Sequence, residues 1–74
     1  MKPPRIHGFD LGNLFWVRSR IPGMTQRELA HLAKVRIETV RALEQGKRRA
    51  NWTTLYKFAE VLQVLPEALI QEKA

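Results

Sequence analysis

The sequence predicts an all-α protein, folded as a compact five-helix bundle in one small domain. Three observations predict this class. Apolar residues recur three and four residues apart along most of the chain, capping residues bracket these stretches, and no stretch alternates apolar and polar residues as a half-buried strand does. The 74 residues provide one small core and exclude a deep catalytic cleft roofed by a second domain. We therefore expect function to be carried on the surface.

The chain divides into a short arm and a single domain. Residues 1–9 contain Pro3, Pro4 and Gly8 and show neither helical nor strand periodicity. This pattern, together with several basic residues, predicts a flexible basic arm. Residues 10–74 carry the helical pattern and form the domain.

The first helix is predicted to follow Asp10, whose carboxylate is a suitable N-cap. The helix is predicted to run through residues whose apolar members recur three and four positions apart: Leu11, Leu14, Phe15, Val17 and Arg18. The run Ile21-Pro22-Gly23 ends the helix, because proline lacks an N–H and glycine favours a turn.

A capping box marks the start of the second helix. In Thr25-Gln26-Arg27-Glu28, the threonine oxygen accepts from the N–H of Glu28 and the glutamate returns to the threonine N–H. The helix therefore begins at Gln26 and buries Leu29 together with either Leu32 or Ala33.

A third helix follows after only three residues. Lys34-Val35-Arg36 interrupts the apolar register, and Val40 and Leu43 start a new one. Gly46 is a suitable left-handed cap for its end. The result is a pair of short helices joined by a tight turn.

The last third of the chain predicts two more helices. Asn51 caps the fourth, whose apolar stripe places five residues in the core: Trp52, Leu55, Phe58, Ala59 and Leu62. Pro66 fits the first turn of a short fifth helix with Leu65, Leu69 and Ile70 on one side.

The charge of the chain is high and uneven. Thirteen Lys and Arg residues against seven Asp and Glu give a formal net charge of +6. Residues 1–49 hold 11 basic and 4 acidic residues, a balance of +7, whereas residues 50–74 hold 2 and 3, a balance of −1. A field of this sign favours a polyanion, although a basic face that merely aids solubility is an alternative.

Several classes of function are disfavoured. The chain has no cysteine, so cysteine-based zinc fingers and thiol nucleophiles are excluded and a cytoplasmic location is expected. His7 and His31 have no metal-binding spacing, and no nucleophile with a base and an orienting acid can be assembled. We therefore expect no catalytic residue, no metal and no cofactor. Apolar runs such as Val61–Leu65 fall far short of the roughly 20 residues that a membrane span needs.

A longer motif connects the middle helices. It consists of Met24-Thr25-Gln26-x-Glu28-Leu29-Ala30, Val35, Thr39-Val40 and Leu43-Glu44-x-Gly46-Lys47. In this pattern the chain resembles the Cro/phage-repressor-type (XRE) helix-turn-helix family, over about residues 11–70. The resemblance implies a lambda-repressor-like bundle that binds double-stranded operator DNA, usually as a dimer. It also implies a bacterial or phage-type, nucleoid-associated protein.

Under this resemblance the recognition helix is residues 37–45. Its base-reading residues are Arg36, Ile37, Glu38, Arg41 and Ala42. Arginine donates two hydrogen bonds to guanine, glutamate accepts from the cytosine amino group, and isoleucine or alanine contacts a thymine methyl. For Glu38 the alternative is a solvated carboxylate that pairs with Arg41 or Arg27.

The resemblance also implies a set of phosphate contacts. They are Thr25, Gln26, Gln45, Lys47, Arg48, Arg49 and Asn51. Gln26 lies in the first turn of its helix, where free backbone N–H groups and an amide side chain can clamp a phosphate. The loop after the recognition helix supplies affinity without sequence information, unless its Lys-Arg-Arg run is simply solvated.

One residue pair is implied to be structural. Glu44 matches the family's helix-end glutamate, which in several members pairs with an arginine of the first helix, here Arg18. Such a half-buried pair would orient the recognition helix without touching DNA.

Three positions depart from the family pattern. Lys34 and Gln63 stand where glycine is usual, and Arg36 stands at the usual Ser/Thr/Asn cap. Pro22 accompanies an extra residue between the first two helices. These departures affect local geometry and the base-reading register.

We expect a sequence-specific transcriptional regulator, a repressor that forms a homodimer through the last helix around Leu65, Leu69 and Ile70. One alternative is an antitoxin-type module that binds a protein toxin as well as its own promoter. Another is a restriction-modification controller. Outside regulation, an RNA-binding or membrane-surface role remains, and the lack of a basic amphipathic helix with aromatic residues on its other face argues against the membrane version.

Overall fold

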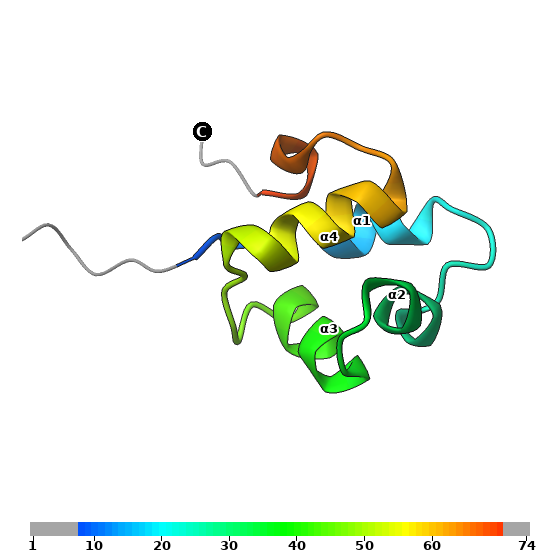
Figure 1. Cartoon of the computed structure of the whole chain (residues 1–74), viewed down its shortest axis with the longest axis horizontal. Helices are drawn as coiled ribbons and strands as arrows, with labels where there is room; N and C mark the ends of the chain where they lie inside the picture. Colours follow the sequence, from blue (N-terminus) through cyan, green and yellow to red (C-terminus); the bar gives the residue numbers. More distant parts are fainter. Residues whose placement is uncertain (1–7, 71–74) are drawn as a thin grey trace, which may run out of the picture.

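The computed structural model describes residues 8–70 of the chain. These residues form four α-helices and one 3-10 turn, with no strand among them: α1 (Leu14–Ser19), α2 (Gln26–Ala33), α3 (Ile37–Glu44), α4 (Trp52–Leu62) and η1 (Pro66–Leu69). Figure 1 shows α4 across the middle of the molecule, with α2 and α3 on one side and η1, in orange, on the other. The predicted all-α class is confirmed, whereas the predicted count of five α-helices is wrong.

The core lies between α4 and the elements around it. Its largest fully buried side chains are Phe58, Leu11, Leu14, Leu29, Leu43, Leu55, Leu69 and Val40. Each such leucine or phenylalanine contributes about 1.5–3 kcal/mol relative to an exposed one. On α2, Leu29 is joined in the core by Ala33, which is 3% exposed, and not by Leu32, which is 45% exposed.

The predicted N-cap hydrogen bonds of α2 and α4 are present, but the return half of the predicted capping box is not, because the N–H of Thr25 donates to the carbonyl of Gly23 at 3.1 Å. The Thr25 hydroxyl accepts a hydrogen bond from the N–H of Glu28 at 3.0 Å, and the Asn51 side chain accepts one from the N–H of Thr54 at 2.8 Å. Each bond satisfies a backbone donor that has no partner within its helix. Both helices therefore begin where the sequence predicts, at Gln26 and Trp52.

Both positions where the family has glycine adopt the left-handed conformation. Lys34 ends α2 with φ 60° and Gln63 ends α4 with φ 58°. The following N–H groups close the turns: Val35 donates to the carbonyl of Ala30 at 2.9 Å and Val64 to that of Ala59 at 3.0 Å. An L-residue in this conformation costs roughly 1–2 kcal/mol, so the chain carries this strain twice.

The predicted fifth helix is a single 3-10 turn. Within η1 the N–H of Ala68 donates to the carbonyl of Leu65 at 2.9 Å, a bond between residues three apart. The turn ends at Ile70, whose backbone is extended, with φ −87° and ψ 130°. Asn13 donates its backbone N–H to the carbonyl of Leu69 at 3.2 Å and its side-chain N–H to that of Ile70 at 3.3 Å.

The first helix begins later than predicted, and Asp10 does not cap it. The N-cap residue is Asn13, whose side chain makes no capping hydrogen bond because it is committed to η1. Two residues of the predicted arm, Gly8 and Phe9, lie beside Ala50, with which Phe9 forms an isolated antiparallel bridge. This pairing holds the chain extended just before α1. The rest of the predicted arm, residues 1–7, lies outside the described residues.

The core position predicted for Trp52 is wrong. The residue is the first of α4 and is 55% exposed. Its ring stacks on Tyr56 with centroids 4.7 Å apart and packs against Phe9 at 5.1 Å. The helical stripe therefore enters the core only from Leu55 onward.

No helix in residues 8–70 is long and apolar enough to cross a membrane.

Candidate nucleic-acid interface

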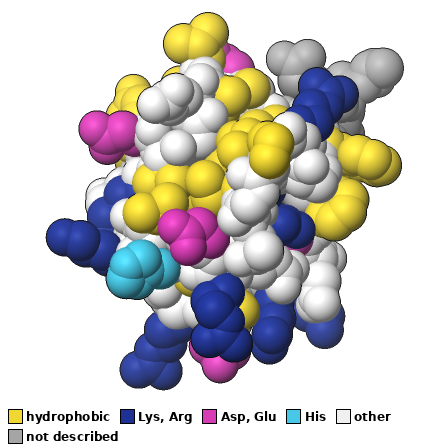
Figure 2. All heavy atoms as spheres, turned by 90° about the vertical axis from the view of Figure 1, so that its right-hand side faces the viewer, with side chains coloured by type: hydrophobic (Ala, Val, Ile, Leu, Met, Phe, Trp, Pro, Cys, Tyr) yellow, Lys and Arg dark blue, Asp and Glu magenta, His cyan; other side chains and the backbone are white. Residues whose placement is uncertain are grey.

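Basic side chains gather over α2, α3 and the loop that follows α3. Figure 2 shows most Lys and Arg side chains in its lower part, on the side where α2 and α3 lie, and hydrophobic side chains in its upper part. The exposed cations of these elements are Arg27, Lys34, Arg36, Arg41, Lys47, Arg48 and Arg49. Such a concentration of one charge sign attracts a polyanion such as nucleic acid.

The helix α3 has one buried and one exposed face. Val40 and Leu43 are buried in the core. On the other side, Arg36, Glu38 and Arg41 are exposed. An α-helix with its side chains is about 10–12 Å across, which suits the roughly 12 Å width of the DNA major groove. The outward face of α3 can therefore approach base edges.

The five residues predicted to read bases are not equally accessible. Arg36, Glu38 and Arg41 are exposed, whereas Ile37 and Ala42 are half-buried. Ile37 packs partly against the core cluster. The polar members thus have the greatest reach, and the two apolar members can offer only the outer part of their side chains.

Arg36 occupies the N-cap position of α3 and does not cap it. Its backbone is extended, with φ −79° and ψ 149°, and its side chain makes no capping hydrogen bond. The guanidinium has donors only, so it cannot accept from the free N–H groups of the first turn. The N–H of Thr39 donates instead to the carbonyl of Arg36 at 3.0 Å, and the Arg36 side chain is exposed at this end of α3.

A hydrogen-bond network joins α1, α2 and α3. Arg18 donates through Nε and Nη2 to the two carboxylate oxygens of Glu44, with side chains that are 11% and 5% exposed, and through Nη1 to the carbonyl of Met24 at 3.0 Å. The guanidinium carbon also lies 5.5 Å from the centre of the Phe15 ring. The Arg18–Glu44 pair proposed from the family resemblance is therefore formed, and it ties the end of α3 to α1.

Gln26 belongs to the same network, which sequence reasoning missed. Its Nε2 donates to Glu44 Oε1 at 2.8 Å. Eighteen residues separate the two side chains, so no local pattern signals their contact. The amide keeps a second N–H that can donate to a phosphate, at a position fixed by the end of α3.

The basic loop after α3 starts with a tight turn. Gly46 adopts φ 76°, and the N–H of Lys47 donates to the carbonyl of Ala42 at 2.9 Å. This turn directs the chain away from α3 and leaves Gln45 and Lys47 exposed. Of the predicted phosphate residues, Gln26, Gln45 and Lys47 thus lie around the end of α3.

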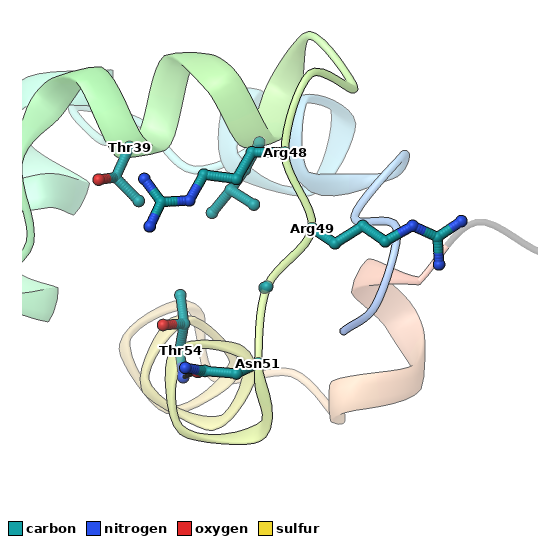
Figure 3. A pocket seen from close by; sticks show the side chains of 7 residues that line it. Thr39, Arg48, Arg49, Asn51 and Thr54 are labelled. Carbon is teal, nitrogen blue, oxygen red and sulfur yellow. Dashed lines mark hydrogen bonds between the residues drawn. The ribbon is translucent and has the colours of Figure 1, made fainter. Parts of the chain in front are cut away.

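Arg48 and Arg49 point to opposite sides of the loop (Figure 3). Arg48 extends toward Thr39 of α3, over a shallow hollow that is also lined by Asn51 and Thr54. The side chain of Arg49 leaves the other side of the loop and its Nη1 donates to the carbonyl of Gly8 in a long hydrogen bond of 3.4 Å.

Two threonines near the loop were not among the predicted site residues. Thr39 of α3 and Thr54 of α4 place hydroxyl groups beside the hollow under Arg48 (Figure 3). A helical pattern marks both only as polar, because their meeting depends on how α3 packs against α4. No sequence signal would have found them.

Comparison with protein families gives a match over most of the described residues. The family model described as helix-turn-helix matches residues 22–69, which is more than half of the chain and spans α2, α3, α4 and η1. No curated protein matches the chain significantly, and no solved structure does.

Proposed function

The chain belongs to the XRE-type helix-turn-helix family of DNA-binding transcription regulators, and from this premise we propose that it is a repressor that reads a specific operator. The observation that carries the proposal is the outward face of α3, where Arg36, Glu38 and Arg41 are exposed opposite the buried Val40 and Leu43. A helix of this kind, braced by the preceding one, enters the major groove in helix-turn-helix proteins.

In the proposed complex α3 supplies the sequence reading. Arg36 and Arg41 each donate a pair of hydrogen bonds to a guanine, and Glu38 accepts from a cytosine amino group. Ile37 and Ala42 are half-buried and contact thymine methyl groups with the exposed part of their side chains.

The surrounding residues supply affinity. Lys47 and Arg48 neutralise phosphates, while Gln45 and Asn51 donate side-chain N–H groups to them. On the α2 side, Thr25 contributes its hydroxyl, while Gln26 contributes a first-turn N–H of that helix and its side-chain N–H. Arg49 adds charge to this surface, although its guanidinium is turned toward Gly8.

A single domain offers a small DNA contact, so we propose that two copies bind adjacent half-sites. Half-sites about one DNA turn apart would multiply the affinity of each copy. The interface predicted around Leu65, Leu69 and Ile70 needs correction, because Leu69 is fully buried in the core of its own chain. Leu65, which is 71% exposed, is the residue of this group that a second copy can reach.

The test is selection from a pool of random DNA duplexes at two salt concentrations, followed by sequencing of the retained DNA. We expect an enriched palindrome whose retention persists at the higher salt. Arg41→Ala should lose preference at one base position, by about 1–3 kcal/mol. Lys57→Ala is the matched control, because it removes the same charge from an exposed position on α4. Salt-sensitive retention with no enriched sequence would contradict a specific operator.

A further inference from the structure

The first two described residues lie against the loop that joins α3 to α4. Phe9 and Ala50 form an antiparallel bridge in which the N–H of Phe9 donates to the carbonyl of Ala50 at 2.7 Å and the N–H of Ala50 donates to that of Phe9 at 3.0 Å. Ala50 is 2% exposed, so the bridge closes over a buried residue. It ties the chain before α1 to the end of the basic loop.

The backbone of Gly8 lies so close to this loop that there is no room for a side chain. Its φ is +118°, and an added Cβ would lie 2.8 Å from the carbonyl oxygen of Ala50 and 2.9 Å from the Cβ of Arg49. Real Cβ atoms essentially never come so near to other atoms. Any L-residue with a side chain at position 8 would therefore have to push the segment off the loop.

Two side chains extend the contact on either side of the bridge. Arg49 donates through Nη1 to the carbonyl of Gly8 at 3.4 Å. The ring of Phe9 packs against that of Trp52, the first residue of α4, with centroids 5.1 Å apart. The Gly8–Phe9 segment thus touches the chain at Arg49, Ala50 and Trp52, which cover the end of the loop and the start of α4.

We infer that Gly8 and Phe9 form a brace that positions Arg48 to bind a DNA phosphate, an inference that rests on the proposed function. Arg48 precedes the braced residues, and its side chain points to the side of the loop opposite Arg49 (Figure 3). Arg49 is held toward Gly8, and the side chain of Arg48 leaves the opposite side of the loop, over the hollow beside Thr39. A long side chain binds better when its backbone is already ordered, because less freedom is lost on binding.

The salt dependence of DNA binding distinguishes loss of the brace from a general loss of stability. Each phosphate contact contributes about −0.9 to the slope of log K against log salt concentration. Loss of a phosphate contact lowers that slope, whereas partial unfolding lowers the concentration of active protein at every salt. Gly8 and Phe9 are positioning residues, since they act through Arg48.

The experiment measures binding of the full chain to a mixed-sequence duplex of about 20 base pairs at salt concentrations from about 50 to 200 mM. Gly8→Ala should reduce the magnitude of the slope by about 0.9, so that its loss of affinity is about 3.5-fold larger at the low end of this range than at the high end. Arg48→Ala should give the same reduction. The double variant should show no further change, because both substitutions remove one contact.

Three controls accompany these variants. Phe9→Leu keeps both backbone hydrogen bonds of the bridge and should keep the original slope. Ala59→Gly weakens α4 away from the loop and should lower stability without changing the slope. Amide hydrogen exchange at Ala50 reports the bridge directly and should accelerate in Gly8→Ala. Should that variant not fold, Phe9→Pro removes one bridge donor and provides the same test.

The outcomes separate the brace from the proposed function. A reduced slope in Gly8→Ala that does not add to that of Arg48→Ala supports the brace. An unchanged slope with faster exchange at Ala50 overturns it and leaves DNA binding intact. Absence of any salt-dependent DNA binding by the unaltered chain overturns the proposed function, and the brace with it.

Discussion

Replacing Glu44 by alanine would leave the guanidinium of Arg18 in a site where its side chain is only 11% exposed and without its counter-ion. Two of the three donor atoms of that guanidinium bond to Glu44, and only Nη1 would keep its partner, the carbonyl of Met24 at 3.0 Å. Gln26 would lose the acceptor of its Nε2 as well. The substitution therefore strands one charge and one amide donor near the core.

The expected loss of stability follows from this burial. Removing one partner of a buried ion pair costs about 3–5 kcal/mol, because the remaining charge stays desolvated. We expect about 3 kcal/mol, at the low end, since Met24 and the Phe15 ring still contact Arg18. A chain of 74 residues has a total stability of roughly 4–11 kcal/mol. The substitution should therefore remove a large part of it.

Urea unfolding followed by circular dichroism measures the effect. Glu38→Ala is the control, because it removes an exposed glutamate from the same helix and should change stability by less than about 0.5 kcal/mol. The double variant Arg18→Met with Glu44→Leu should recover most of the loss, since no charge is then left unpaired. A loss below about 1 kcal/mol in Glu44→Ala would refute the reasoning, because that is the range of exposed ion pairs.

Three further predictions concern other elements. Gln63→Gly relieves a left-handed residue and should raise the free energy of unfolding by about 1 kcal/mol; a lower urea midpoint would contradict it. Arg36→Ser supplies the missing cap of α3 and should raise that free energy by about 0.5–2 kcal/mol while weakening operator binding, and tighter binding would count against base reading by Arg36. Leu69→Ala opens a cavity under η1 and should lower the free energy of unfolding by about 2–5 kcal/mol with base preference unchanged; a loss under about 1 kcal/mol would mean that η1 is not part of the core.

Local signals correctly predicted where α2 and α4 begin and which face of α3 is buried. The N-caps at Thr25 and Asn51 act within one helical turn, so α2 and α4 begin where the sequence indicates. The burial of Val40 and Leu43 follows from their spacing on α3. These features depend on neighbours three or four residues away and need no knowledge of the tertiary fold.

Long-range contacts decided the features that were predicted wrongly. Asn13, the residue before α1, donates its backbone N–H to the carbonyl of Leu69 and its side-chain N–H to that of Ile70. This contact joins the start of α1 to the end of η1, and no local pattern signals it. Trp52 lies on the helical stripe, yet it is 55% exposed and its ring packs against Phe9 and Tyr56.

The sequence by itself determined the helical class, the α2–α3 pair, the basic character of one side and the residue types that face outward from α3. Only the tertiary structure decided that Gln26 would share Glu44 with Arg18, and that Arg48 and Arg49 would diverge. Hydrophobic periodicity and helix caps depend on residues a few positions apart and can therefore be recognised from the sequence. The direction of a polar side chain is set by whichever distant backbone or charge lies within hydrogen-bond reach, and that is known only once the helices have packed.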